Sequence, residues 1–132
     1  MTIGLQDARS CADRAIAVAQ RAGARIGICV VDAVGTVVHL DRMDGAALAT
    51  TDLAEAKALS ALNFQLPTSR IAETIGEHEL TSVREALRFP LLTQPGGVPI
   101  VRGVTTIGSL GVAGGTAEQD ELIALAALGV DG

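Results

Sequence analysis

Residues 26–42 read IGICVVDAVGTVVHLDR, and this stretch is the strongest indication of the fold. Ile26 to Val31 form a short apolar run rich in β-branched residues, and Thr36 to Arg42 form a second extended segment. The intervening Asp32 to Gly35 are residues typical of a short turn between two strands. The stretch therefore predicts a β-hairpin whose first strand is the more buried of the two.

Helical patterns lie on both sides of this hairpin. Apolar residues recur at helical spacing from Leu5 to about Ala22, and Gly23 is a suitable end for that helix. A second helix is predicted from about Thr51 to Asn63. Two further helical stretches are predicted, at Arg70–Ile75 and at Leu80–Arg88.

The C-terminal third repeats the hairpin-and-helix order. An ordered loop from Phe89 to Pro99 carries three prolines and two glycines. Strands are expected at Ile100–Val101 and at Thr105–Val112, followed by a helix from Ala117 to about Leu128. Hairpins separated by helices favour an antiparallel sheet with helices packed on it. We expect one α+β domain over residues 1–132, with about five strands.

The apolar side chains of this chain are mostly small. Hydrophobic residues make up 48% of the sequence, yet it has only two Phe and neither Trp nor Tyr. Such a core packs closely but buries little area per residue, so we expect a homo-oligomer that adds burial. Gly108 and Gly111, inside a predicted strand, indicate close approach by another backbone or by a ligand.

The composition argues against several function classes. The formal net charge is −5, and the chain lacks the basic face that nucleic-acid phosphates need. No apolar stretch reaches the length of a membrane helix, and charged residues interrupt any signal-peptide core. Cys11 and Cys29 are too few for a disulfide framework or a zinc site. We expect a cytoplasmic protein that binds neither nucleic acid nor membrane and has no metal site.

The segment from Gly114 to Asp120 is the sharpest local signal. Thr116 and Gln119 have the spacing of a capping box at the start of a helix. Gly114 and Gly115 precede that cap and would let an anion approach the free N–H groups of the helix end. A capped helix start without any ligand is the alternative.

Lys57 is the second candidate, because the helical projection places it on an apolar face. A lysine there is costly unless it meets a carboxylate or lines a cavity. It would serve anion binding or proton transfer, or its ammonium group would reach solvent along the protein surface.

A third group of polar residues begins at Arg42, where the second predicted strand ends and a loop follows. Binding residues often lie in such loops. Arg42 and Asp44 would bind a ligand, or Arg42 would pair with Asp44 or Asp41. His39 and His78 are weak candidates for haem ligation or base catalysis.

Five blocks in the chain resemble, in the same order, the GlcG/HbpS-like proteins. They are VDAVG at 31–35, RMDGA at 42–46, DLAEAKA at 52–58, GGVPI at 96–100 and IGSLGVAGGTAEQD at 107–120. The resemblance implies a profilin-like fold with a central antiparallel sheet, an oligomeric assembly and haem as a candidate cofactor. The segment from Glu77 to Arg88 is more polar and helix-like than in the family, which predicts a changed pocket wall.

Two hypotheses about function follow. The first is a binding protein for a small carboxylate-bearing molecule or a tetrapyrrole such as haem. Its expected ligand contacts are Arg42, Asp44, Lys57, Gly114, Gly115, Thr116 and Gln119. The second is a cofactor-independent lyase, isomerase or hydrolase acting on a small carbonyl or carboxylic substrate. Its expected acid–base groups are Lys57, Asp120, His78 and Glu79. The sequence leaves open whether the protein is an enzyme.

Overall fold

A computed structural model of the chain describes residues 1–129. Its elements alternate between helices and antiparallel strand pairs, in the order expected. They are α1 (Leu5–Ala22), β1 (Gly27–Asp32), β2 (Val37–Arg42), α2 (Thr50–Phe64), η1 (Thr68–Arg70), α3 (Ile71–Ile75), α4 (Leu80–Ala86), β3 (Gly97–Arg102), β4 (Thr105–Ala113) and α5 (Ala117–Ala127).

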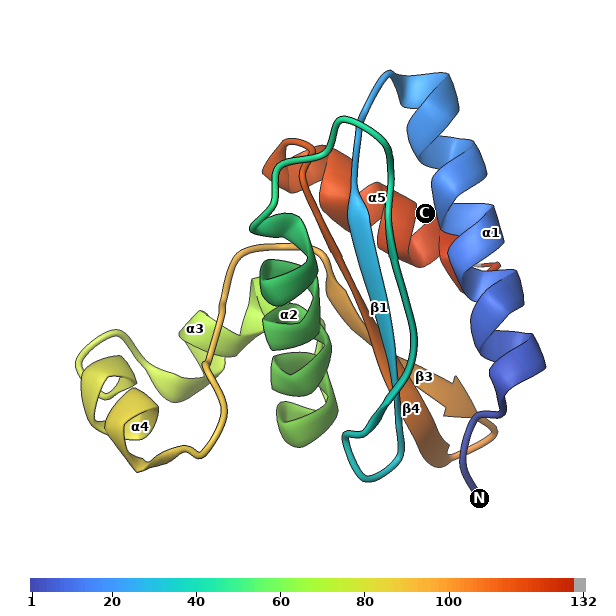
Figure 1. Cartoon of the computed structure of the whole chain (residues 1–132). Coiled ribbons are helices and arrows are strands. Elements are labelled where there is room, and N and C mark those ends of the chain that lie inside the picture. The colour runs from blue at the N-terminus through green and yellow to red at the C-terminus, as the bar shows by residue number, and fades with distance from the viewer. Residues whose placement is uncertain (130–132) are drawn as a thin grey trace.

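The strands form one antiparallel sheet with the order β2-β1-β4-β3 (Figure 1). The predicted α+β class and antiparallel sheet are confirmed. The expectation of about five strands was wrong, because the sheet has four over residues 1–129. The long segment between α2 and β3 supplies no further strand, since it folds into η1, α3, α4 and loops.

The first hairpin forms as predicted, and its turn is held by a side chain. Asp32 accepts hydrogen bonds on one carboxylate oxygen from the Val34 and Thr36 amides, both at 3.0 Å. This local bonding is why aspartate favours turns. β1 is almost wholly buried whereas the residues of β2 are half-buried or exposed, which confirms that the first strand is the more buried.

β3 starts three residues earlier than the sequence indicated, at Gly97 rather than Ile100. It includes Pro99, which lies opposite Ser109 of β4. Proline has no N–H to donate, but an edge strand needs ladder bonds on one side only. β3 is an edge strand, so it can begin within the segment that was predicted to be a loop from its prolines and glycines.

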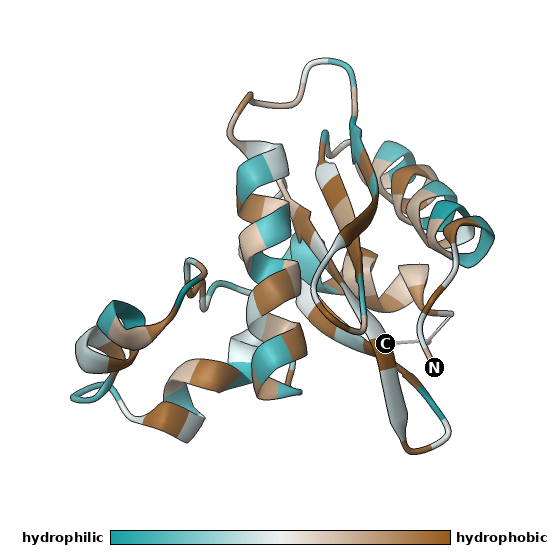
Figure 2. Cartoon of the chain, turned by 60° about the horizontal axis from the view of Figure 1, so that its bottom comes forward, coloured by the Kyte–Doolittle hydropathy of each residue, from teal (hydrophilic) through white to brown (hydrophobic). Residues whose placement is uncertain are grey.

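Helices cover both faces of the sheet (Figure 1). α1 and α5 pack on one face around a core of small and branched apolar side chains, and α2 packs on the other. The hydropathy view shows apolar residues along the strands between these helices (Figure 2). A Cβ at Gly111 would collide with the Ala54 carbonyl oxygen of α2. The predicted close approach at this glycine is therefore made by a helix backbone.

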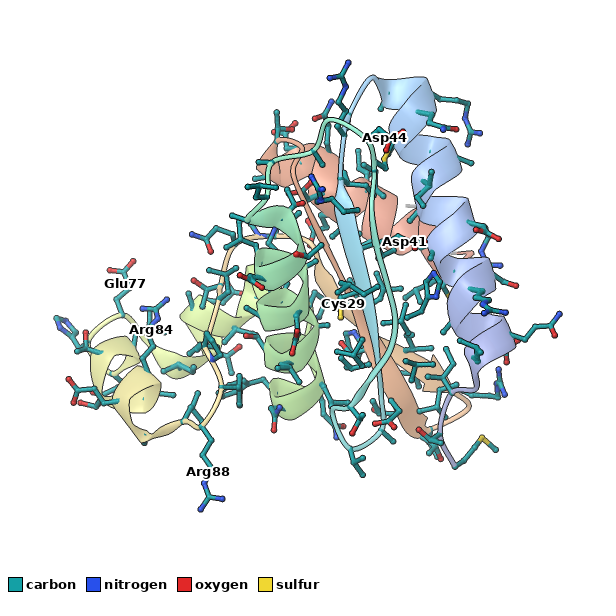
Figure 3. The ribbon with its side chains drawn as sticks, viewed as in Figure 1. Cys29, Asp41, Asp44, Glu77, Arg84 and Arg88 are labelled. Atoms are coloured by element: carbon teal, nitrogen blue, oxygen red, sulfur yellow. The ribbon has the colours of Figure 1, made fainter. Side chains whose placement is uncertain are left out.

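The segment carrying α3 and α4 extends away from the sheet (Figure 1). α4 has no buried residue. The labelled side chains of Glu77 and Arg88 point outward from this segment (Figure 3), whereas Arg84 Nε donates to the Leu91 carbonyl oxygen at 3.3 Å. Within residues 1–129, no helix is both long enough and apolar enough to cross a membrane.

Candidate functional site

Lys57 is buried at the face of α2 that meets the sheet. Its side chain is only 6% exposed, so the ammonium group does not reach along the surface to solvent. Nζ donates to the Val112 carbonyl oxygen at 2.9 Å and to Oδ2 of Asp120 at 3.2 Å. The hypothesis that this lysine meets a carboxylate is thus confirmed, and the alternative of a solvent-reaching lysine is wrong.

Asp120 reaches the same point from the first turn of α5. Its side chain is 5% exposed, and its Oδ1 accepts the Gly115 amide at 2.8 Å. The capping box also forms, because Thr116 Oγ1 accepts the Gln119 amide while Gln119 Oε1 accepts the Thr116 amide. The protein's own carboxylate therefore occupies the anion position that the glycines were expected to offer to a ligand.

The Lys57–Asp120 pair lies at the wall of a pocket of about 410 Å³. A pocket of this size is within the usual range for small organic ligands. Most of its lining is apolar or backbone. The lining residues are Ala47, Ala49, Thr50, Leu53, Lys57, Leu92, Gln94, Pro95, Ala113, Gly114, Gly115, Ala117 and Asp120. We call this the Lys57 pocket.

Gly96 keeps room for the buried pair. Its φ of +130° lies in the region that favours glycine, and its carbonyl accepts the Val112 amide at 2.8 Å. A Cβ at this position would lie 3.0 Å from Nζ of Lys57 and 3.1 Å from Cβ of Asp120. The sequence alone did not assign Gly96 to the site, although Gly96 begins the GGVPI block at 96–100.

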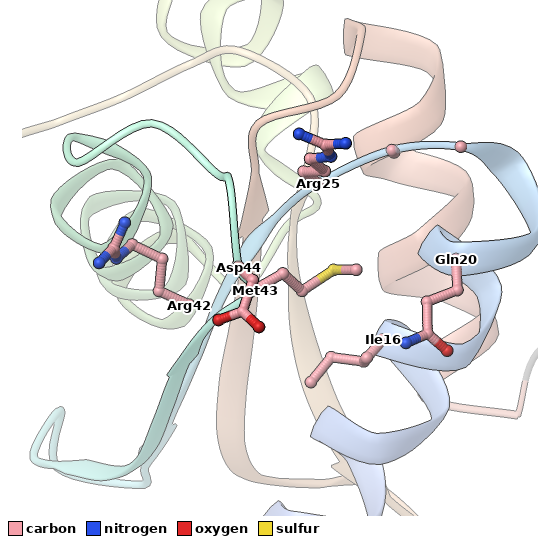
Figure 4. Close-up of a pocket in the computed structure, with 8 residues that line it drawn as sticks. Ile16, Gln20, Arg25, Arg42, Met43 and Asp44 are labelled. Carbon is pink, nitrogen blue, oxygen red and sulfur yellow. The ribbon is translucent and has the colours of Figure 1, made fainter.

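Arg42 and Asp44 line a different pocket, of about 560 Å³, between the end of α1 and the end of β2. The Met43 side chain extends toward Ile16 and Gln20 of α1, whereas Arg42 extends away from them (Figure 4). Arg42 Nη1 donates to the Ala46 carbonyl oxygen at 3.1 Å, which fixes the loop after β2. The structure therefore does not bring Arg42 and Lys57 into one pocket.

The expected acidic partners of Arg42 are not used. Over residues 1–129, Arg42 forms no ion pair with Asp41 or Asp44. Asp41 instead accepts from His39, with Nε2 and Oδ2 2.8 Å apart. The two alternate along β2, so their side chains share one face of the strand.

His78 and Glu79 are exposed and lie just before α4. Neither lines the Lys57 pocket. Of the four residues expected to act as acid–base groups, the structure brings together Lys57 and Asp120 only.

Both cysteines are buried and free. Burial raises the pKa of the Cys29 thiol to about 12, with a smaller contribution from the charge of Glu55. Figure 3 places Cys29 between α2 and the sheet. Burial also raises the pKa of Cys11, against the opposing effect of Arg14. Both thiols fit the role of small core residues.

Comparison with known proteins gives relatives along nearly the whole chain. A Citrobacter freundii protein, described as an uncharacterised 15.0 kDa protein from the dhaT-dhaS intergenic region, is 31% identical over 96% of this chain and 90% of its own length. The corrinoid adenosyltransferase PduO of Salmonella typhimurium is 29% identical over 97% of this chain. The match spans only 38% of that enzyme.

Solved structures agree with this picture. Klebsiella pneumoniae protein ORFY superposes with a TM-score of 0.91 at 30% identity, over 98% of this chain and 90% of ORFY. A haem complex of PduOC superposes with a TM-score of 0.89 at 28% identity, over 98% of this chain and 94% of that one. The family model described as haem degrading protein HbpS-like matches residues 3–129. The chain therefore belongs to the HbpS-like family.

Proposed function

We propose that this protein binds a small molecule with an apolar body and a carboxylate, in the Lys57 pocket. The observation that carries the proposal is a buried ammonium group at the wall of a mostly apolar pocket. Its contacts within residues 1–129 engage two of the three N–H donors of a lysine. The third donor would bind the ligand carboxylate.

The charge of Asp120 has to be offset for an anion to bind beside it. Asp120 and Lys57 together are neutral, so a ligand carboxylate brings one uncompensated negative charge. The N-terminus of α5 carries a partial positive charge, and Ala117 of its first turn lines the pocket. Asp120 and the capping box already bond the Gly115, Thr116 and Gln119 amides, so those amides are not offered to the ligand. The ligand carboxylate would be held by the third donor of Lys57 and by the partial positive charge of the helix end.

A tetrapyrrole is one form of such a ligand, because haem carries carboxylates as propionates. The family description and the haem complex of the PduOC relative support haem as a candidate. The iron is a poorer match, since the lining of the Lys57 pocket has no His, Cys, Met or Tyr to bind it. This pocket fits the carboxylate of haem and does not fit its iron, so we derive no iron chemistry from it.

The test compares ligands on the unaltered protein before any substitution. We expect 3-phenylpropionate to bind in calorimetric titration. Its amide should bind about tenfold more weakly, because it lacks the negative charge of the carboxylate. Hemin is titrated separately by visible absorption. Binding of hemin alone would identify the ligand as a tetrapyrrole, and binding of 3-phenylpropionate alone would identify it as a small organic acid.

Substitution then locates the site. Lys57→Met should lower the affinity for the carboxylate probe at least about tenfold. Arg42→Ala reports on the neighbouring pocket and should leave that affinity within about twofold if the ligand sits at Lys57. Equal affinities for the acid and its amide, or an effect of Arg42→Ala alone, would reject the proposal.

An enzyme is the second candidate, favoured by one observation. Lys57 and Asp120 are adjacent and both line the pocket, an arrangement suited to moving a proton on a carbonyl or carboxylic substrate. Turnover lost in both Lys57→Met and Asp120→Asn would support it. Turnover unchanged in both would exclude it.

We also propose that the protein forms a homo-oligomer. The edge strand β2 leaves Val37 and Leu40 exposed, and the loop after it exposes Leu48. Association with a second copy would cover such exposed apolar side chains. Light scattering tests this directly, and a monomer at all concentrations would reject it.

A further inference from the structure

We propose that Ser60 and Thr68 are positioning residues that hold one wall of the Lys57 pocket. Both side chains are hydroxyl-bearing and fully buried, and neither lines the pocket itself. The wall is the chain from residue 90 to residue 97, which supplies Leu92, Gln94 and Pro95 to the lining.

Ser60 fixes the start of this wall to α2. Its Oγ accepts the Leu92 amide at 3.0 Å and donates to the Ala56 carbonyl oxygen at 2.7 Å. The hydroxyl group therefore links the helix backbone to the wall backbone. An alanine at this position would leave the Leu92 amide without its partner.

Thr68 fixes the end of the wall in the same way. Its Oγ1 donates to the Gln94 carbonyl oxygen at 2.7 Å and accepts the Gly97 amide at 2.9 Å. One side chain thus satisfies two wall groups on either side of Pro95 and Gly96. Because Gly96 borders the Lys57–Asp120 pair, the two hydrogen bonds of Thr68 also set the distance between the wall and the buried charges.

The two hydroxyl groups lie before the α3–α4 segment in sequence, and the wall lies after it. The segment leaves the body between Thr68 and Pro90 and extends away from the sheet (Figure 1). Neither α3 nor α4 contributes a residue to the Lys57 pocket. The projecting segment also bonds the wall, because Arg84 Nε of α4 donates to the Leu91 carbonyl oxygen at 3.3 Å. The bonds at Ser60 and Thr68 are the ones that join the wall to α2 and η1, and they pre-organise the pocket for binding.

Amide hydrogen exchange in the full chain tests the positioning without any ligand. Ser60→Ala should raise the exchange rate of the Leu92 amide about tenfold, and Thr68→Val that of the Gly97 amide, as expected for one lost hydrogen bond. Thr68→Ser keeps the hydroxyl group and should restore protection at Gly97. Ser109→Ala is the matched control, because Ser109 is a buried serine that donates to the Val98 carbonyl oxygen outside the pocket.

The affinity for 3-phenylpropionate provides the second readout, which alone rests on the proposed function. Ser60→Ala and Thr68→Val should weaken it about fivefold to tenfold, with Thr68→Ser and Ser109→Ala within about twofold of the unaltered protein. If the unaltered protein binds no carboxylate, the proposed function fails and the exchange rates still decide the positioning. Unchanged exchange at Leu92 and Gly97 in the variants would overturn the inference, as would an equal effect of Ser109→Ala.

Discussion

Replacing Lys57 by methionine tests whether the burial of the Asp120 charge depends on the ammonium group of Lys57. Methionine keeps the length of the apolar stem and removes the ammonium group. Asp120 would then remain buried with the Gly115 amide as its described partner. Removing one partner of a buried ion pair typically costs about 3–5 kcal/mol, because the other charge is left uncompensated. With side chains only 6% and 5% exposed, this pair belongs in that range.

Such a loss is a large fraction of the stability of a domain of this size, which is about 5–15 kcal/mol. Urea unfolding followed by far-UV circular dichroism at pH 7 is the suitable assay, since the chain has no Trp or Tyr to report by fluorescence. The midpoint should fall while the slope of the transition stays the same.

The double variant Lys57→Met/Asp120→Asn separates loss of the pair from loss of packing. Asparagine keeps an oxygen for the Gly115 amide and carries no charge. We expect the double variant to be more stable than Lys57→Met by at least about 1.5 kcal/mol. The reasoning would be refuted if Lys57→Met cost less than about 1 kcal/mol, or if the double variant were the least stable of the set.

Three further predictions concern packing, a thiol and a helix cap. Gly111→Ala should destabilise the protein by about 1–3 kcal/mol in thermal unfolding, because its Cβ meets the α2 backbone. Cys29 should resist alkylation at pH 8 until urea unfolds the chain, because burial raises the pKa of its thiol from 9.0 to about 12. Stability should therefore fall as pH rises above about 9, where the unfolded thiol ionises and the folded one does not. Thr116→Ala should cost about 1 kcal/mol in urea unfolding through loss of the capping box.

The packing and helix-cap predictions each have a control variant within the chain. Gly4→Ala adds a Cβ where no atom lies within 4 Å, so it should leave thermal stability close to that of the unaltered protein. Thr116→Ser keeps the capping oxygen and should retain most of the stability. Alkylation of Cys29 at equal rates in the folded and unfolded chain would contradict the burial argument. An unchanged thermal stability of Gly111→Ala would contradict the packing argument.

The sequence by itself determined the order of elements and the helix start at Thr116. These follow from local rules: Asp32 and Gly35 favour a turn, periodic apolar residues favour a helix, and Thr116 with Gln119 form a cap within four residues. The sequence also predicted the apolar helix face of Lys57, but it left open whether the ammonium group is buried or reaches solvent. Element ends were less accurate, as β3 shows, because an edge position makes a proline acceptable.

Only the tertiary structure decided which of these residues meet. Asp120 lies 63 residues from Lys57, and no local rule pairs two groups so far apart. The same packing placed Arg42 in a separate pocket and left His78 and Glu79 on the exposed segment before α4. Helix and turn preferences act over a few residues, whereas a site is assembled by contacts between distant segments. This difference in range is the physical reason why local sequence patterns indicated the fold, whereas the pocket became visible only in the folded chain.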